Sequence, residues 1–122
     1  MFRYKVILLF VVVVTILSGC ESNNNDIGEV SFYTDAQAWL NCGPFGVHVY
    51  IDGEKKGTLI NPVIGIQPDC GDSSTLTVQL QEGYHTYFAE GDCADLEWEG
   101  NFKIIQNHCT LIFLDFHEGL KD

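Results

Sequence analysis

Apolar and polar residues alternate with a period of two along most of the chain after residue 30. In residues 47–52, for example, Val47, Val49 and Ile51 alternate with more hydrophilic residues. Successive side chains of a β-strand point to opposite faces, so this pattern predicts strands with one buried face. Such strands are expected over residues 30–33, 47–52, 75–80, 84–90, 97–106 and 109–116.

The dipeptide Asp52-Gly53 predicts a hairpin over residues 49–59, because the turn needs a residue that tolerates positive φ. Residues 34–40 offer N-cap candidates in Thr34 and Asp35, but the stretch is too short to be a stable helix by itself. About seven short strands joined by glycine-rich turns predict an all-β fold, a small antiparallel β-sandwich.

The one long apolar run, residues 6–17, lies near the N-terminus, follows Arg3 and Lys5, and is interrupted only by Thr15. A short positive region, an apolar run and small residues before Cys20 are typical of a secretory signal. A transmembrane anchor is the alternative, but a helix of this length spans about 18 Å, against a hydrocarbon core of about 30 Å. The pattern therefore favours export.

The four residues that close this run, Leu17-Ser18-Gly19-Cys20, resemble the lipobox of bacterial lipoproteins. The resemblance implies a signal peptide over residues 1–19, cleavage after Gly19, and a diacylglycerol on the Cys20 thiol. A single acyl chain binds a membrane only marginally, and the three chains, typically palmitate, that lipoprotein processing adds make the attachment stable. Glu21 stands where some bacteria use aspartate to retain lipoproteins in the inner membrane, which favours the outer membrane of the cell envelope.

The remaining chain divides into residues 20–29, the lipidated cysteine with a polar tether, and residues 30–122, a single domain. Without residues 1–19, four lysines face seventeen carboxylates and the formal net charge is −13. This charge disfavours nucleic acid and anionic lipid headgroups as partners, so the membrane contact is expected through Cys20 alone. Self-repulsion also predicts a monomer.

Cys42, Cys70, Cys93 and Cys109 are an even number of cysteines in a small exported domain, which predicts two disulfides. None of them forms the closely spaced pair of a zinc site. Three connectivities are open. We expect Cys42–Cys70, because each precedes a strand and two reversals between them return the chain to one end of the sandwich, and Cys93–Cys109 by elimination. Simple up-and-down counting of strands places Cys93 and Cys109 at opposite ends, which argues against the second pair.

Three stretches also resemble a known family: Val47-x-Val-Tyr-Ile-Asp-Gly-Glu-x-x-Gly-Thr, Leu80-Gln-Glu-Gly83-Tyr-His85, and Trp98-Glu-Gly100-Asn-Phe-Lys-Ile. They are similar to PEGA-type and related carboxypeptidase-regulatory-like (prealbumin-like) domains of bacterial envelope proteins, over roughly residues 47–116. The Pro-Glu-Gly-Ala tetrapeptide is absent, and the cysteines and the long 61–74 connection are departures. The resemblance implies an Ig-like or prealbumin-like sandwich that serves as a binding, spacing or assembly module without catalytic residues.

Four carboxylates, Asp92, Asp95, Glu97 and Glu99, surround Trp98. An irregular acidic loop can bind calcium, but this spacing is not that of an EF-hand, and a solvated acidic loop is favoured. A small metal-dependent hydrolase using this loop is the alternative function. Because the chain contains no recognised nucleophile, zinc or phosphate-binding motif, we expect no enzyme, no catalytic or metal-binding residues and no cofactor.

The histidines and several aromatic residues are the other candidates. His85 is expected to be half-buried and hydrogen-bonded. The other three histidines, His48, His108 and His117, are not spaced like the ligands of a metal site, and we expect them to be surface residues. Aromatic side chains near loops or on strand faces can stack on sugars or anchor a protein partner, with burial in the second sheet as the alternative. They are Tyr33, Trp39, Phe45, Tyr50 and Tyr84. The expected function is thus an envelope lipoprotein whose sandwich binds an envelope protein or a glycan.

Overall fold

The fold is seen in a computed structural model that describes residues 26–35, 46–93 and 95–120. These residues form seven strands and a single helical turn. The elements are β1 (Ile27–Thr34), β2 (Val47–Ile51), β3 (Glu54–Leu59), β4 (Leu76–Gln81), β5 (Gly83–Gly91), β6 (Glu97–Ile104), β7 (Cys109–Leu114) and α3 (Phe116–Gly119). No helix within the described ranges is long and apolar enough to span a bilayer. Cys20, Trp39, Cys42 and Phe45 lie outside these ranges.

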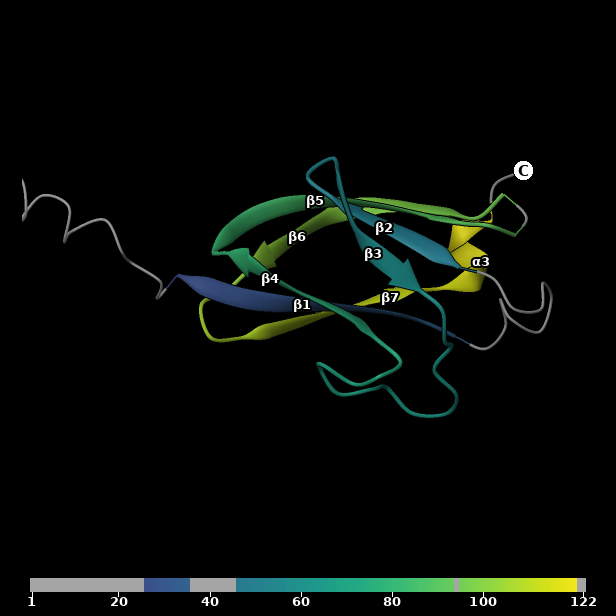
Figure 1. The fold of residues 1–122 in the computed structure, drawn as a ribbon, viewed down its shortest axis with the longest axis horizontal. Coiled ribbons are helices and arrows are strands. Elements are labelled where there is room, and N and C mark those ends of the chain that lie inside the picture. The colour runs from purple at the N-terminus through teal and green to yellow at the C-terminus, as the bar shows by residue number, and fades with distance from the viewer. Residues whose placement is uncertain (1–25, 36–45, 94, 121–122) are drawn as a thin grey trace, which may run out of the picture.

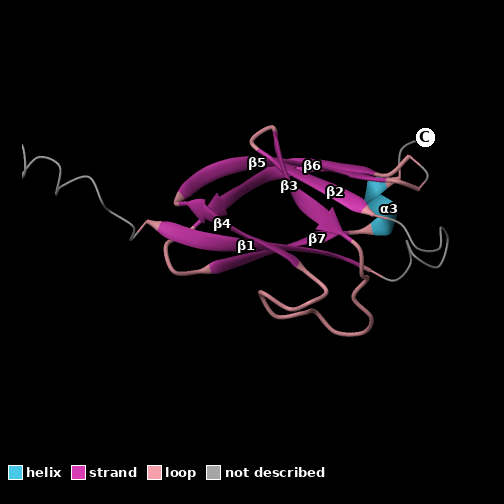
Figure 2. Ribbon diagram, viewed as in Figure 1, coloured by secondary structure: helices cyan, strands magenta, loops and turns pink. Residues whose placement is uncertain are grey.

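The strands form two sheets, one with the order β4-β1-β7 and one with the order β3-β2-β5-β6. Figures 1 and 2 show them as two layers of a small sandwich, which confirms the predicted fold class. Pairing is antiparallel except between β1 and β7, which are parallel, with Glu29 opposite Cys109 and Thr34 opposite Leu114. This one parallel pair departs from the predicted antiparallel pattern. Strands β1 and β7 are far apart in the sequence, so no tight turn between them forces an antiparallel arrangement.

The Asp52-Gly53 hairpin between β2 and β3 is confirmed. Asp52 has φ 52° and Gly53 φ 83°, so the turn has the positive φ that it was expected to need, and it has it at both residues. Strand β1 begins earlier than expected, at Ile27, which lies opposite Gln81 and accepts a hydrogen bond from Asn107 N–H at 3.0 Å. Residues 27–29, assigned to the tether from sequence, therefore belong to the sheet; Gly28 and Glu29 have low strand propensity, which hid them.

The core lies between the two sheets and consists of the inward-facing residues of the alternating pattern. Phe32 is at its centre, edge-on to Tyr87 at 5.5 Å and to Phe102 at 6.2 Å between ring centroids. The buried apolar residues are Val30, Phe32, Val47, Val49, Ile51, Leu59, Ala89, Leu96, Trp98, Phe102, Ile104, Leu114 and Phe116. Except for Leu96 and Phe116, which lie outside the strands, these residues follow a period of two along their strands.

Trp98 closes one end of the sandwich together with α3. Its indole N–H donates to the carbonyl oxygen of Asp115 at 2.8 Å, and Asp115 also caps α3 by accepting from His117 N–H at 3.3 Å. A Cβ on Gly119 would collide with the Trp98 ring, so only glycine fits there. The strand expected at residues 109–116 ends at Leu114 because the chain turns into α3 to cover Trp98.

A disulfide joins Cys70 to Cys109, with their Cα atoms 6.3 Å apart. The predicted pairs Cys42–Cys70 and Cys93–Cys109 are therefore wrong. Counting strands up and down failed because the chain passes from the four-stranded sheet at β6 to the three-stranded sheet at β7. Strand β7 therefore starts beside the start of β1, and the long connection from β3 to β4 returns to the same place. Cys93 is disulfide-bonded as well.

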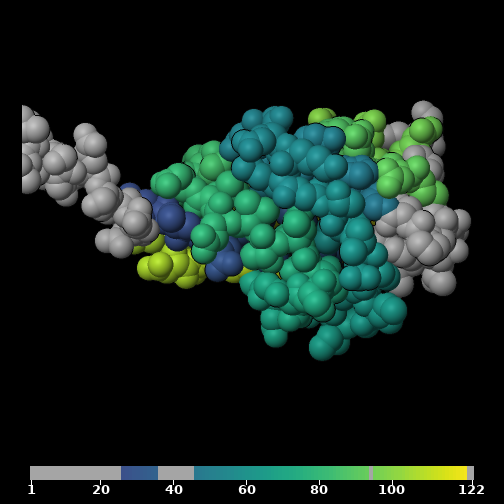
Figure 3. Space-filling model, viewed as in Figure 1, coloured from purple at the N-terminus to yellow at the C-terminus, as the bar shows by residue number. Residues whose placement is uncertain are grey.

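That connection, residues 60–75 and hereafter the 60–75 loop, covers part of the outer face of the three-stranded sheet. Its Gly71 N–H donates to Ser31 Oγ at 3.3 Å, and Ser31 is within hydrogen-bonding distance of Thr77, 2.6 Å between the oxygens. Ser31 points away from the core and is nevertheless completely buried. In Figure 3 the loop forms the teal-to-green bulge on the lower side of the molecule.

Candidate ligand-binding groove

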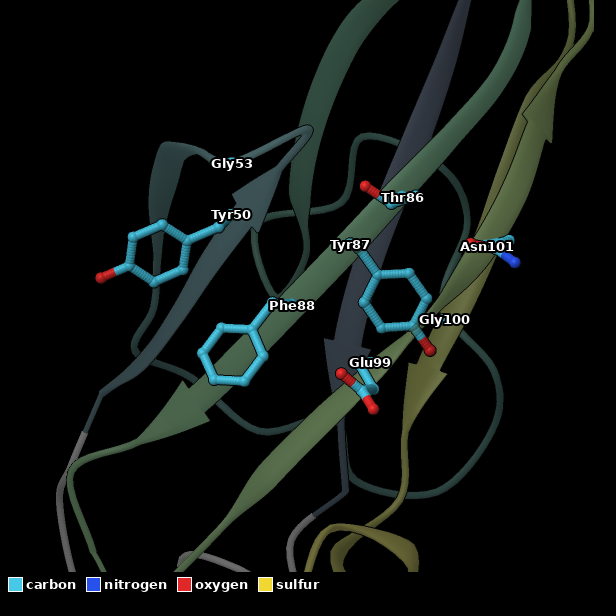
Figure 4. A pocket seen from close by; sticks show the side chains of 8 residues that line it. All are labelled: Tyr50, Gly53, Thr86, Tyr87, Phe88, Glu99, Gly100 and Asn101. Carbon is cyan, nitrogen blue, oxygen red and sulfur yellow. The ribbon is translucent and has the colours of Figure 1, made fainter.

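The outer face of the four-stranded sheet contains an open groove of about 720 Å³. This volume lies within the range of small-molecule sites, roughly 300 to 1,000 Å³. The groove crosses strands β2, β5 and β6 and is shown in Figure 4. It is lined by Tyr50, Gly53, Thr86, Tyr87, Phe88, Glu99, Gly100 and Asn101.

One side of the groove is aromatic. Tyr50 on β2 and Phe88 on β5 are opposite residues of the two strands, with ring centroids 6.0 Å apart and planes tilted by 46°. Their neighbours Val49 and Ala89 are fully buried, so Tyr50 and Phe88 point away from the core. Outward positions of a solvated sheet are ordinarily polar, and an aromatic pair there supplies apolar ring faces for a ligand.

The other side of the groove is polar. Thr86 lies opposite Asn101, and Phe88 lies opposite Glu99, so a hydroxyl, an amide and a carboxylate stand beside the aromatic pair. These groups offer both hydrogen-bond donors and acceptors.

Tyr87 and Gly100 line the groove from between the two sides through their backbone, because they alternate with the outward residues and face the core. They are opposite residues of β5 and β6, and a Cβ at Gly100 would stand 2.8 Å from Cε1 of the Tyr87 ring. Figure 4 shows the Tyr87 hydroxyl beside Gly100. Burial, and secondarily the charge of Glu118, raises the pKa of Tyr87, so its hydroxyl stays neutral and can donate or accept a hydrogen bond.

A histidine–aspartate pair fixes the hairpin turn at one end of the groove. His85 Nδ1 is 2.6 Å from Asp52 Oδ2, and His85 Nε2 is 2.8 Å from the Gln81 carbonyl oxygen. Both partners are acceptors, so both ring nitrogens must donate and His85 is an imidazolium. Asp52 also accepts from Thr86 N–H at 3.0 Å. His85 is half-buried, as expected, and stacks on Phe102.

These contacts shift both pKa values of the pair. The hydrogen bond from His85, with that from Thr86, lowers the pKa of Asp52. Burial alone would lower the pKa of His85, but its hydrogen bonds to Asp52 and Gln81 outweigh burial and raise it above its ordinary value. Folding therefore favours the charged form of both residues.

A second pair lies at the other end of β2. His48 Nε2 is 2.7 Å from Asp92 Oδ1, and His48 Nδ1 is 3.1 Å from Thr58 Oγ1. Asp92 also accepts from Gly46 N–H at 3.2 Å, and the hydrogen bond with His48 is the main cause that lowers its pKa. His48 is thus half-buried and paired rather than a free surface residue, whereas His108 and His117 are exposed, as expected.

The four candidate carboxylates do not share one site. Asp92 faces His48, Glu97 lies opposite Glu90, and Glu99 lines the groove. Across residues 26–35, 46–93 and 95–120, no group of three histidine, cysteine, aspartate or glutamate side chains is arranged to hold a metal ion. The groove itself offers groups for hydrogen bonding and stacking.

The aromatic candidates are divided between the two sheets. Tyr50 lines the groove; Tyr84 is 80% exposed beside it on β5, with the Lys103 ammonium 5.5 Å from its ring centroid. Tyr33 lies on the three-stranded sheet and stacks on Phe113. Phe88 and Asn101 were missed from sequence, although their outward positions follow from the alternation in β5 and β6.

Neither a protein-family model, nor a curated protein, nor a solved structure matches this chain.

Proposed function

We propose that this chain is a non-catalytic, lipid-anchored protein of the bacterial cell envelope whose sandwich binds an uncharged glycan in the groove. The aromatic pair of Tyr50 and Phe88 carries the proposal. Apolar faces of sugar rings stack on aromatic rings, and sugar hydroxyls pair with the kinds of groups that Thr86, Glu99 and Asn101 provide.

The negative charge of the protein favours an uncharged ligand over an anionic one. The chain has a formal net charge of −11, and Glu99 lies within the groove. Anionic glycans would be repelled by this carboxylate and by the field of the whole protein. Neutral sugars, including N-acetylated ones, avoid this repulsion.

The lipid anchor at Cys20 supplies the location. Strand β1 begins at Ile27, so only residues 21–26 separate the domain from the lipidated cysteine. Fully extended, they reach about 20 Å, which holds the domain close to its membrane, proposed to be the outer one. Replacing Cys20 with Ser should abolish incorporation of labelled palmitate and release the protein from membranes. Labelling that persists in this variant would contradict the anchor.

Glycan binding is tested with the full chain in detergent micelles and neutral N-acetylglucosamine oligomers, by calorimetry. We expect Tyr50→Ala and Phe88→Ala each to weaken binding about tenfold, since one stacked ring contributes about 1 to 1.5 kcal/mol. Tyr84→Ala is the matched control, because Tyr84 is an exposed aromatic residue of the same sheet outside the groove. Oligogalacturonate, an anionic oligomer, should bind more weakly than the neutral one.

Two results would contradict this function. Equal loss of affinity in the Tyr84→Ala control would show that the stacking is not confined to the groove. Release of shorter sugars during incubation would support the hydrolase alternative, and replacement of Glu99 with Gln would then show whether this carboxylate is responsible.

A further inference from the structure

Two large side chains are exposed at the end of the sandwich where β1 begins. Tyr84, at the start of β5, is 80% exposed, and Ile105, just after the end of β6, is 47% exposed. Glu82 N–H donates to the Asp26 carbonyl oxygen at 2.7 Å, which holds the start of β5 beside the start of β1. Figure 1 shows the turns β4–β5 and β6–β7 at this same end, hereafter the tethered end.

The end of β6 lies equally close to the start of β1. A Cβ on Gly28 would collide with the carbonyl oxygen of Ile105, and Asn107 N–H donates to the Ile27 carbonyl oxygen at 3.0 Å. The side chain of Ile105 follows the fully buried Ile104 and is itself in water. Tyr84 and Ile105 therefore lie at the end of the domain from which the chain leads back to Cys20.

A lysine accompanies the tyrosine. Tyr84 and Lys103 are opposite residues of β5 and β6, and the Lys103 ammonium is 5.5 Å from the centroid of the Tyr84 ring. Among the residues that the structure describes, no carboxylate forms an ion pair with Lys103. Tyrosine rings are enriched at the boundary between lipid headgroups and acyl chains, and lysine side chains reach from such a position to the headgroups.

The acidic residues are unevenly distributed along the domain. Several carboxylates lie at the end opposite to the tethered one, where β1, β5 and β7 end and β6 begins. They are Asp35, Asp92, Glu97, Asp115 and Glu118. At the tethered end, Asp26 and Glu82 stand beside Lys103, which disfavours anionic lipid but not zwitterionic lipid. The net charge alone, from which membrane contact through Cys20 only is expected, does not take this distribution into account.

We propose that the tethered end lies on the membrane that holds the lipid anchor. The Tyr84 ring and the Ile105 side chain enter the boundary between headgroups and acyl chains of zwitterionic phospholipid, and the Lys103 ammonium pairs with lipid phosphates. This inference rests on the anchor at Cys20 that is part of the proposed function.

The length of the tether is what assigns lipid to these side chains. Residues 21–26 reach about 20 Å when fully extended, so the tethered end stays beside the bilayer. Two side chains are too few to hold a free domain on a membrane. A short tether makes the contact intramolecular, and a weak contact is then sufficient.

This contact also orients the glycan groove. Phe88 lies four residues beyond Tyr84 on β5, about 13 Å farther along the strand at the usual rise of 3.3 Å per residue. The groove is on the outer face of the sheet, so it opens sideways above the headgroups and remains accessible. Tyr84 does not line the groove, which keeps its lipid contact separate from glycan binding.

The test uses the full lipidated chain in phosphatidylcholine nanodiscs that contain a lipid with a nitroxide on its headgroup. Isoleucine methyl resonances are compared before and after the nitroxide is reduced. We expect the nitroxide to abolish the Ile105 resonance, whereas Ile64 and Ile66 should keep theirs. These two are 81% and 87% exposed, but they follow Val63, which bridges to the far end of β1.

A substitution separates lipid contact from mere proximity. Tyr84→Ser should restore the Ile105 resonance while the chain stays anchored, because the ring no longer holds the tethered end in the lipid. Tyr84 is so exposed that this variant should fold, and the other methyl resonances check that it does. Tyr50→Ser is the matched control, since it removes an outward tyrosine of the same sheet away from the tethered end, and the Ile105 resonance should stay lost.

Two results would overturn the contact without affecting the anchor or the groove. The first is an Ile105 resonance that persists in the anchored protein. The second is equal loss of this resonance in Tyr84→Ser, which would attribute the effect to the tether alone. Retention on the nanodiscs and glycan binding are measured on the same samples, so these failures are distinguishable from failure of the proposed function. A chain that does not associate with the nanodiscs would overturn the anchor and this contact together.

Discussion

The outer faces of the two sheets have the same alternating sequence pattern but different surroundings. On the three-stranded sheet, outward-facing Ser31 is completely buried beneath the 60–75 loop and hydrogen-bonds to Thr77. On the four-stranded sheet, outward-facing Thr86 is exposed at the open groove. A period of two therefore identifies the inner face of each strand, but it does not say whether the outer face meets water or another segment.

The difference follows from one long-range link. The 60–75 loop contains little regular structure, and the Cys70–Cys109 disulfide attaches it to the edge strand β7. Among the residues that the structure describes, the open face has no such cover, and it carries the larger side chains Tyr50 and Phe88 instead. Small hydroxyl residues suit the covered face because they pair with each other and leave room for the loop.

Removing the disulfide should have the largest effect, because it detaches the loop that makes the two faces different. Replacing Cys70 and Cys109 together with Ser should destabilise the protein by about 4 kcal/mol, because the bridge closes a loop of 39 residues. That is a large share of the stability of a small domain and should lower the melting temperature by well over ten degrees. Denaturant unfolding and thermal melts measure the effect.

Glycan binding in the opposite groove is the internal control for this variant. Below its melting temperature the variant should keep its affinity for the oligomers, since no groove residue contacts the bridge. Non-reducing peptide mapping of the unmodified protein should yield a Cys70–Cys109 peptide. Cys93 is also disulfide-bonded, and we expect mapping to identify Cys42 as its partner. A Cys42–Cys70 peptide would contradict the structure.

The fold class was accessible from sequence because it depends on local patterns. Alternation identified the inward residues of β2 and β5, and Asp52-Gly53 identified the hairpin turn. The pairing of β1 with β7 was not accessible, since parallel neighbours are joined by no local turn. The error in the disulfides followed directly, because their geometry depends on which sheet Cys109 enters.

The groove could be predicted from sequence only in part, for a similar reason. Tyr50 stood out as an aromatic residue on a strand, but its partnership with Phe88, and that of Phe88 with Glu99, depends on the register of β2, β5 and β6. Register is determined by turns and by both faces together, which a single strand does not show.

Deleting one hydroxyl group from each outer face compares the two faces directly. Ser31→Ala should destabilise the protein by about 1 to 2 kcal/mol, because it leaves Gly71 N–H without its acceptor under the loop. Thr86→Val, which removes an exposed hydroxyl and keeps a β-branched side chain, should change stability by less than about 0.5 kcal/mol. Equal losses from denaturant unfolding would show that the two faces are similarly covered.

The smallest expected effect is a pH dependence on the open side, from His85 and Asp52. The raised pKa of His85 contributes stability that is complete below its unfolded value of about 6.5 and is lost as pH rises through the higher folded value. The lowered pKa of Asp52 contributes stability above its unfolded value of about 3.9, lost as pH falls through the lower folded value. The pair therefore stabilises the fold most between about pH 4 and 6.5.

Raising the pH from 6 to 9 should thus reduce the free energy of unfolding, by less than about 1 kcal/mol, because the Asp52 side chain is 50% exposed and solvent screens the interaction. Asp52→Asn is the matched variant, since asparagine tolerates positive φ and can still accept from Thr86 N–H. The difference between the two stability profiles isolates this pair from the His48–Asp92 pair, which both proteins retain. If the difference stays constant from pH 6 to 9, His85 does not need its second proton to hold the hairpin, and the imidazolium assignment fails.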